Sequence, residues 1–458
     1  MSFDSPAFFA LFILVFVLCR RFPMFAGPFL LIGSIAFYSY VGPLDVAVVS
    51  VVVLLNYVGS FFVTLGRLWL GIVIAANLGI LAFFKYRHFF FPELAQEVKD
   101  FYQSEILIPI GISFYIFQAI AYQVDLTRGH APHIRSFWQF ALFKLFFAQL
   151  IAGPIVRAKV FAPQVANAFR GRLGGRRIWS IGIGLFVMGL LKKVGLADSL
   201  APYVDAIFTL GPATTLTAWL GVTLFAFQIY FDFSGYSDMA VGIGYLLGIR
   251  LPQNFRQPYL ARDPREFWQR WHITLSTWIR DYVYVPLGGS RAGGALRQAA
   301  ILILTMGLAG LWHGASWSFV LWGVFWGTYI ALWRLLRRWI EPMGAWFWVP
   351  HIAIVLLLWV LFRSNGIEDA AFYFGAMFGQ PTGEYSLVDS FAAAFWVLLG
   401  VAFLMLSQLA EAKFTALYWL VKWRRLDGPV MWGILSGIAL WLIIYPNPHA
   451  NPFIYFRF

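Results

Sequence analysis

Long apolar runs separated by short polar segments dominate this chain. The runs cover residues 6–19, 25–41, 45–64, 67–84, 106–124, 137–156, 179–197, 214–231, 237–249, 298–312, 315–333, 345–362, 391–409 and 430–445. They are continuous, whereas a membrane β-barrel shows alternating segments of about 10 residues. Because a spanning helix needs about 20 residues, the shorter runs are expected to be re-entrant or broken. The pattern predicts an all-α polytopic membrane protein with roughly 11 to 13 transmembrane helices and additional re-entrant or interfacial helices.

The segment 250–297 departs from this pattern because it is rich in both arginine and aromatic residues. On a helix over 266–282, seven residues form an apolar stripe at 3.6-residue spacing: Phe267, Trp268, Trp271, Leu275, Trp278, Ile279 and Tyr282. Gln269, Ser276 and Arg280 occupy the other face, and His272 falls at the border between the two. Such a helix is typical of a segment that lies in the membrane interface or plugs a polar cavity. Pro264 and Pro286 are placed to mark its two ends.

The amino-acid composition is that of a membrane protein and argues against a soluble domain and a nucleic-acid-binding protein. The chain has 458 residues, of which 60% are hydrophobic and 12% charged, against about 25% charged residues in soluble domains. No polar segment is long enough for a soluble domain, so residues 1–458 are expected to form one integral-membrane domain. The net charge of +13 lies in short loops, which the positive-inside rule explains better than nucleic-acid binding.

Two histidines are the main candidates for chemistry. His313 lies between apolar runs and His272 lies in the aromatic segment, 41 positions earlier. An ionisable residue at membrane depth is costly and suggests a functional site, and an imidazole kept from water stays neutral and can accept a proton. His313 is either such a base or a structural hydrogen-bonding residue, and metal or haem ligation would need partner ligands. His272 could orient an acceptor or stabilise charge on an acyl carbonyl. The other histidines are expected at interfaces: His88, His130, His133, His351 and His449.

Gly310 and Gly314 flank His313 at a spacing that allows close approach of a helix or a substrate. Earlier in the chain, Asp232 and Asp238 interrupt the apolar segment around 231–238. They either line a polar tunnel or form ion pairs with arginines of 250–297. The helix-breaking segments 109–114 and 152–157 are expected to line the same cavity, because irregular backbone at membrane depth needs protein or water around it.

Several motifs in order resemble the membrane-bound O-acyltransferase family, and within it the bacterial branch that acts on alginate-type polysaccharides. They are FFKY at 83–86, PIGISFYIFQ at 109–118, LIAGPIVR at 150–157, SGYSDMA at 234–240, NFRQPY at 254–259, EFWQRWHITLSTWIRDYVYVPLGG at 266–289, LWHGASWSFVLWG at 311–323 and NPFIYFRF at 451–458. Each fragment alone is modest, but the ordered set covers nearly the whole chain. Where relatives often carry a further His-Gly, this chain has Trp326 and Gly327, so no third histidine is assigned.

The resemblance implies a helical bundle around a central funnel or tunnel with the two histidines at its centre. By motif position, His313 corresponds to the family's essential histidine and His272 to the second histidine of the bacterial subgroup. Residues expected to support the tunnel are Trp312, Asn254, Asp281, Arg280, Ser234 and Asp238. No metal and no bound cofactor is expected.

The resemblance further implies a multi-pass protein of the bacterial inner membrane that takes acetyl groups from a cytosolic thioester, acetyl-CoA. These groups would pass to a periplasmic partner resembling a serine esterase, which acetylates a polysaccharide. Alternatives within the family are D-alanyl transfer to teichoic acid and O-acetylation of peptidoglycan. A proton-coupled transporter is an alternative from another class, but it predicts inverted repeats, and none is visible in the sequence.

Overall fold

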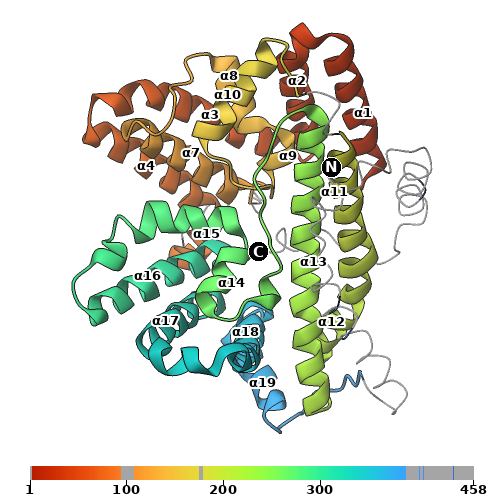
Figure 1. The fold of residues 1–458 in the computed structure, drawn as a ribbon, viewed down its shortest axis with the longest axis vertical. Helices are drawn as coiled ribbons and strands as arrows, with labels where there is room; N and C mark the ends of the chain where they lie inside the picture. Colours follow the sequence, from red (N-terminus) through yellow and green to blue (C-terminus); the bar gives the residue numbers. More distant parts are fainter. Residues whose placement is uncertain are drawn as a thin grey trace. The chain divides into compact units, whose positions relative to one another are not determined.

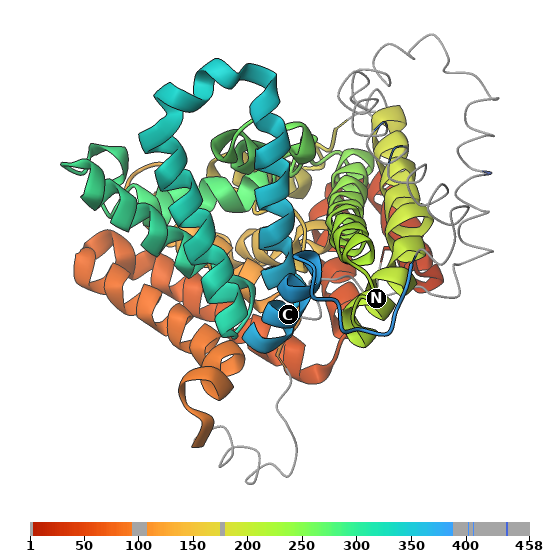
Figure 2. The same ribbon diagram turned by 90° about the horizontal axis from the view of Figure 1, so that it is seen from below.

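A computed structural model describes residues 3–93, 108–174 and 179–387, with the single positions 402, 406 and 437, and helices make up most of this part (Figures 1 and 2). Within these residues the one β-type pairing is a bridge between Pro212 and Tyr385. The helical membrane class predicted from the sequence is confirmed. Helical segments long and apolar enough to cross a membrane in the described part are Pro43–Leu65, Arg67–Phe90, Thr215–Leu247, Ala295–His313 and Trp317–Arg363. The larger number of spans stays a prediction.

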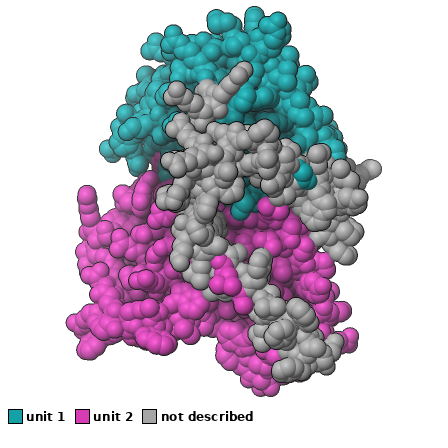
Figure 3. Space-filling view, turned by 45° about the vertical axis from the view of Figure 1, so that its right-hand side comes forward, with its two compact units in different colours: residues 1–190, 236–253, 420–444 teal, residues 191–235, 254–419, 445–458 magenta. Residues whose placement is uncertain are grey.

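The chain divides into two compact units, which Figure 3 colours separately. Unit 1 takes its described residues from 1–190 and 236–253, and unit 2 takes its described residues from 191–235 and 254–387. Each unit therefore combines segments that are far apart in the sequence. The expected single domain over 1–458 stays a prediction.

Unit 1 is built from the amino-terminal helices. These are α1 (Pro6–Arg21), α2 (Ala26–Ser39), α3 (Pro43–Phe62), α4 (Arg67–Leu81), α5 (Arg87–Phe90), α7 (Ile112–Thr127), α8 (Phe137–Leu145), α9 (Phe147–Leu150), α10 (Ala158–Phe169) and α11 (Trp179–Leu190). α7 is buried along almost its whole length, and α3 and α4 pack on it.

Amide side chains join three of these helices inside unit 1. Asn56 of α3 and Asn77 of α4 exchange two hydrogen bonds of 2.9 and 3.1 Å. Gln123 of α7 donates to the backbone oxygen of Asn56 at 2.7 Å. Because few other groups can satisfy a buried amide in an apolar setting, such interhelical bonds hold membrane helices in register.

Unit 2 contains the segment that the sequence singled out. Its helices are α12 (Asp198–Leu210), the first part of α13 (Thr215–Leu247), α14 (Pro264–Arg270), α15 (Ile273–Ile279), α16 (Ala295–His313), α17 (Trp317–Ile340), α18 (Trp348–Arg363) and α19 (Ile367–Met377). α16 and α17 form a tight antiparallel pair, visible side by side in Figures 1 and 2. α14, α18 and α19 contact α17 or one another.

One helix differs from the sequence prediction. The apolar runs 214–231 and 237–249 were expected to be separated by the polar segment 231–238, but α13 runs through it without interruption. A carboxylate inside a helix costs little backbone structure when its side chain finds a partner, because all helical backbone bonds stay within the segment. Asp232 has such a partner in Lys193.

Candidate active site

His272 lies at a break in the helix that the sequence predicted over 266–282. α14 ends at Arg270, α15 begins at Ile273, and His272 between them has the left-handed backbone angles φ 42° and ψ 55°. The prediction of one continuous helix is wrong here. The backbone amide of Ile273 donates to the backbone oxygen of Asn254 at 2.8 Å, and the backbone amide of Arg256 donates to the backbone oxygen of Arg270 at 2.9 Å. The segment after Asn254 therefore takes backbone bonds that a continuous helix would keep.

The boundary signals of this segment hold. Pro264 is the first residue of α14, and Asp263 caps it by accepting a hydrogen bond from the amide of Glu266 at 2.8 Å. The carboxylate of Glu266 in turn accepts from the amide of Arg262 at 2.7 Å. This reciprocal capping satisfies amides that a helix start leaves without partners, and so it fixes the entry into the His272 turn.

Asn254 fixes the orientation of the His272 ring. Its side-chain oxygen accepts from the amide of Thr274 at 3.2 Å and from the Thr274 hydroxyl at 2.9 Å, and it lies 3.1 Å from His272 Nδ1. A backbone amide can only donate, so this Asn254 atom is the acceptor oxygen. His272 Nδ1 must then carry the proton, and the neutral ring has its lone pair on Nε2.

Burial keeps this ring neutral. The His272 side chain is 0% exposed, and its desolvation lowers its pKa from 6.5 to about 3. The rings of Phe233 and Phe255 lie 4.6 and 6.2 Å from the imidazole. At neutral pH, His272 is therefore an uncharged hydrogen-bond acceptor at Nε2.

His313 is held by packing. It is the last residue of α16 and is 4% exposed. Its ring contacts those of Trp312, Trp322 and Phe362 with centroid distances of 4.8, 5.1 and 5.1 Å. The carboxyl end of a helix carries a partial negative charge, so His313 lies where a positive charge is favoured.

Glycines allow the close approach of α16 and α17 beside His313. A methyl group at Gly310 would overlap the carbonyl oxygen of Phe319, and one at Gly323 would overlap the carbonyl oxygen of Met306. Of the two roles that the sequence left open for the glycine pair around His313, close approach of another helix is the one Gly310 fulfils. Gly314 lies against the Phe319 ring.

Trp312 brings the two histidines into one site. Its ring lies 6.2 Å from that of His272 and 4.8 Å from that of His313. We call the rings that contact either histidine the aromatic shell, and its members are Phe233, Phe255, Trp312, Trp322 and Phe362. Of the residues expected to support the site, Trp312 and Asn254 contact a histidine directly.

The support roles expected of Ser234, Asp238, Arg280 and Asp281 stay predictions. Ser234 is buried on α13 in unit 2, whereas Asp238 belongs to unit 1. Arg280 and Asp281 pair with each other at 2.8 Å, and their side chains are 61% and 38% exposed. This pair therefore lies outside the aromatic shell.

Asp232 has a different partner from the one the sequence suggested. Its carboxylate lies 2.9 Å from Lys193 Nζ, and the same Nζ lies 2.6 Å from Asp198. All three side chains are buried. Lys193, in the π-helical segment Leu191–Ala197 before α12, is therefore a partner that the sequence did not suggest, and pairing of Asp232 with an arginine of 250–297 gains no support. Two adjacent lysines in the apolar run 179–197 were the overlooked signal, since cations at membrane depth need carboxylates.

His351 has a partner that the sequence did not suggest. Its side chain is 0% exposed, in the first turn of α18, and its expected place at the membrane interface stays a prediction. Its Nδ1 lies 2.8 Å from the hydroxyl of Tyr329 on α17. His449 lies outside the described residues. Among those residues no group of three or more His, Cys, Asp or Glu could hold a metal ion, so metal ligation gains no support.

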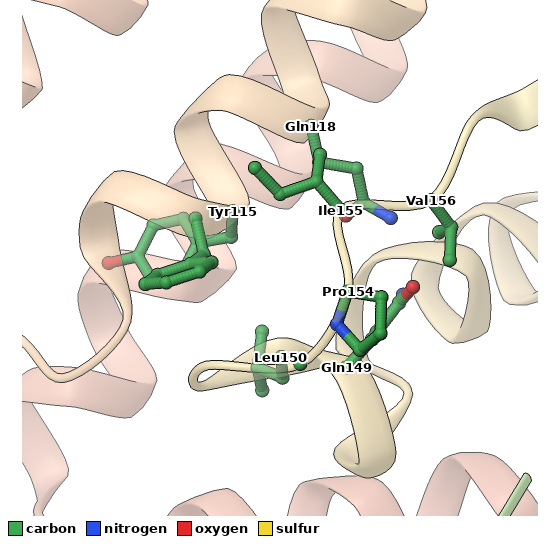
Figure 4. Close-up of a pocket in the computed structure, with 9 residues that line it drawn as sticks. Tyr115, Gln118, Gln149, Leu150, Pro154, Ile155 and Val156 are labelled. Atoms are coloured by element: carbon green, nitrogen blue, oxygen red, sulfur yellow. The ribbon is translucent and has the colours of Figure 1, made fainter. Parts of the chain in front are cut away.

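The two helix-breaking segments line one pocket in unit 1, as expected. Its lining residues are Phe114, Tyr115, Gln118, Gln149, Leu150, Gly153, Pro154, Ile155 and Val156. Figure 4 shows Gln118 of α7 on the side of the segment that carries Pro154 and Ile155, with Leu150 at the end of α9. That this pocket continues into a tunnel with Asp232 stays a prediction.

Fold and site together define an integral membrane protein with a buried pair of histidines joined by one indole. Residues 61–367 match the model of the membrane-bound O-acyltransferase family, and the chain belongs to this family. The resemblance inferred from the motifs is confirmed, and so is the enzyme class at the level of the family. The roles assigned to individual residues stay predictions.

Three bacterial proteins are similar to most of this chain. A probable alginate O-acetylase of Pseudomonas putida is 38% identical over 405 residues, 85% of this chain and 82% of that protein. The probable alginate O-acetylase of Azotobacter vinelandii is 42% identical over 331 residues, 70% of this chain but only 64% of that protein. A peptidoglycan O-acetyltransferase of Helicobacter pylori is 34% identical over 393 residues, 76% of this chain and 73% of that protein.

Proposed function

We propose that this chain is an O-acetyltransferase of the bacterial inner membrane that serves the O-acetylation of an alginate-type polysaccharide. The observation that carries the proposal is the buried pair of His272 and His313 around Trp312. The names of the alginate O-acetylases among its relatives support the acetyl group and the polysaccharide.

His313 is the general base of this proposal. It takes the proton of the acceptor hydroxyl while that oxygen attacks the carbonyl carbon of an acetyl thioester. The carbon–oxygen bond forms, the carbon–sulfur bond breaks, and the thiolate receives the proton from His313. A positioned base contributes about 10²–10⁴-fold to such a reaction. The position at the end of α16 supports this role, because it favours the transient positive charge.

His272 orients the acceptor. Its Nδ1 hydrogen faces Asn254, which leaves the Nε2 lone pair to accept a hydrogen bond from a hydroxyl. A neutral ring in this tautomer has no second N–H to give to an acyl carbonyl. Of the two roles left open by the sequence, orientation of the acceptor is therefore the one this geometry supports.

The donor and the partner follow from the family resemblance. We take acetyl-CoA on the cytosolic side as the donor, and a periplasmic protein resembling a serine esterase as the first acceptor of the acetyl group. A serine hydroxyl and a sugar hydroxyl are equivalent in the chemistry above. The bilayer supplies the apolar surroundings, and no nucleic acid takes part.

The test uses purified protein in nanodiscs with radiolabelled acetyl-CoA, membrane extract from the source cells, and alginate oligosaccharides. We expect release of free CoA and labelled oligosaccharide with the wild type, and a loss of about 10²-fold or more with His313→Ala. His130→Ala is the matched control, because this histidine lies in an exposed loop of unit 1.

Normal transfer by a folded His313→Ala variant would falsify the role of this residue. Labelled peptidoglycan in place of alginate would favour peptidoglycan O-acetylation, which the Helicobacter relative makes the second candidate. Consumption of a carrier-bound D-alanine in place of acetyl-CoA would overturn the acetyl donor and revive the teichoic acid alternative.

A further inference from the structure

Several tryptophans around the histidines carry buried N–H groups that find no acceptor among the described residues. They are Trp268, Trp322, Trp326 and Trp359. Their rings lie close together, with centroid distances of 5.2 Å from Trp268 to Trp326 and 6.3 Å from Trp322 to Trp359. An indole N–H can only donate, and leaving a buried donor without an acceptor is unfavourable.

Trp322 is the tryptophan of this group that lies beside His313. It is the member of this group whose ring contacts His313, at 5.1 Å and nearly perpendicular. Its side chain is 1% exposed and is held between Trp359 and Phe362, at 6.3 and 5.1 Å. The next residue, Gly323, lies against the backbone of α16. The indole is therefore fixed beside the proposed base before any substrate arrives.

The proposed reaction needs a donor at this place. When a hydroxyl oxygen attacks a thioester, the carbonyl electron pair moves onto the carbonyl oxygen, which becomes an oxyanion. His272 cannot supply the donor, because its one N–H faces Asn254. A preorganised donor in a dry site stabilises such a charge far better than water does.

We propose that the Trp322 indole N–H donates a hydrogen bond to the carbonyl oxygen of the acyl thioester and stabilises the oxyanion. This inference rests on the proposed function. Attack forms the carbon–oxygen bond and places the negative charge beside Trp322. Collapse of the intermediate restores the carbonyl and expels the thiolate, and the proton held by His313 passes to the sulfur. Trp322 gains and loses a hydrogen bond but no proton.

The test replaces Trp322 with 3-benzothienylalanine, which keeps the shape of the ring and has sulfur in place of the N–H group. We expect kcat with acetyl-CoA to fall by about 10²-fold while KM for acetyl-CoA changes less than about threefold. Trp219 receives the same replacement as the matched control. Its indole donates to Met377 at 3.1 Å and lies outside the aromatic shell, so kcat should stay within about threefold.

A second readout does not depend on turnover. The carbonyl of 1-¹³C acetyl-CoA bound to the His313→Ala variant should show an infrared stretch at lower frequency than in water, and the Trp322 replacement should move it back. Unchanged kcat and an unchanged stretch in the replaced protein overturn the inference alone. Failure of the wild type to consume acetyl-CoA overturns the proposed function instead, so the two failures are distinguishable.

Discussion

The two histidine segments reach the same burial by opposite means. His272 is held by hydrogen bonds, because its turn has a left-handed backbone and Asn254 fixes its ring. His313 ends a regular helix and is held by three aromatic rings and by the close pairing of α16 and α17. The first arrangement fixes the tautomer of a ring, and the second fixes the place of a ring beside two closely packed helices.

Under the proposed function, this difference suits different chemistry for the two residues. A ring whose tautomer is fixed presents the same atom to every ligand, which suits recognition of a hydroxyl. A ring set among aromatic side chains at the carboxyl end of a helix is placed to take up positive charge, which suits a base. Aromatic faces also tolerate the transient positive charge of an imidazolium. Two kinds of substitution test this comparison. One overfills the contact between α16 and α17, and the other removes the side-chain oxygen of Asn254 that accepts from His272.

The largest effect is expected from Gly310→Ala. The added methyl group would meet the Phe319 carbonyl oxygen of α17, and backbone on both sides leaves no side chain that can move away. Overpacking of this kind costs about 3 kcal/mol and should displace His313. We expect a lower yield of folded protein, a lower apparent Tm in detergent, and loss of transfer activity.

Gly307→Ala is the matched control on the same helix. Its methyl group would lie 3.5 Å from Val324 Cγ2, which is an ordinary van der Waals distance. Stability should stay within about 1 kcal/mol of the wild type, since alanine is also the better helix former. Equal behaviour of the two variants would mean that packing of α16 on α17 does not position His313.

Asn254→Ala tests the hydrogen bonds that hold His272. It removes the oxygen that accepts from His272 and twice from Thr274, at a cost of about 1–3 kcal/mol. Because the His272 ring then loses the hydrogen bond that orients it, kcat should drop by about 10–100-fold. Steady-state kinetics in nanodiscs measure it.

Asn254→Asp keeps an acceptor oxygen at the same place and serves as the control. It should retain clearly more activity than Asn254→Ala. Equal kcat values for the two variants would contradict the view that Asn254 acts by accepting hydrogen bonds.

The sequence predicted the fold class and the residues of the site better than their local geometry. Apolar runs were sufficient for a helical membrane protein, and motif order was sufficient for the family. The two histidines and Asn254 were named in advance. The break at His272 was not, because the apolar stripe over 266–282 fits one helix, and the competing backbone bonds come from Asn254, a residue distant in sequence.

Pairing between distant segments accounts for the other differences. Asp232 was expected either to line a polar tunnel or to pair with an arginine, and its pairing with Lys193 was not foreseen. The contact of His351 with Tyr329 on another helix was not foreseen either. The tryptophan Trp322 was inside a quoted motif, yet its contact with His313 depends on how closely α17 approaches α16. Periodicity and composition carry no information on such contacts.

A smaller effect is expected from Thr274→Val. It removes the hydroxyl that donates to Asn254 at 2.9 Å but keeps the backbone amide that donates at 3.2 Å. The Asn254 oxygen should therefore stay in place, and kcat should fall by about tenfold or less, as expected for loss of one of several hydrogen bonds of about 0.5–1.5 kcal/mol each. A loss as large as that of Asn254→Ala would show that the hydroxyl sets the orientation.

The last prediction concerns how stability, rather than activity, depends on pH. The pKa of His272 is about 3 in the folded protein and near 6.5 in an unfolded chain. Between these values the unfolded chain binds a proton that the folded chain does not, so stability falls as pH decreases from about 6.5 toward 3. His272→Asn removes this difference, and asparagine tolerates the left-handed backbone. The apparent Tm of the variant should therefore fall less steeply than that of the wild type between pH 7 and 4.5. Parallel slopes would show that His272 binds its proton equally in both states, and the neutral acceptor assigned to it would then be wrong.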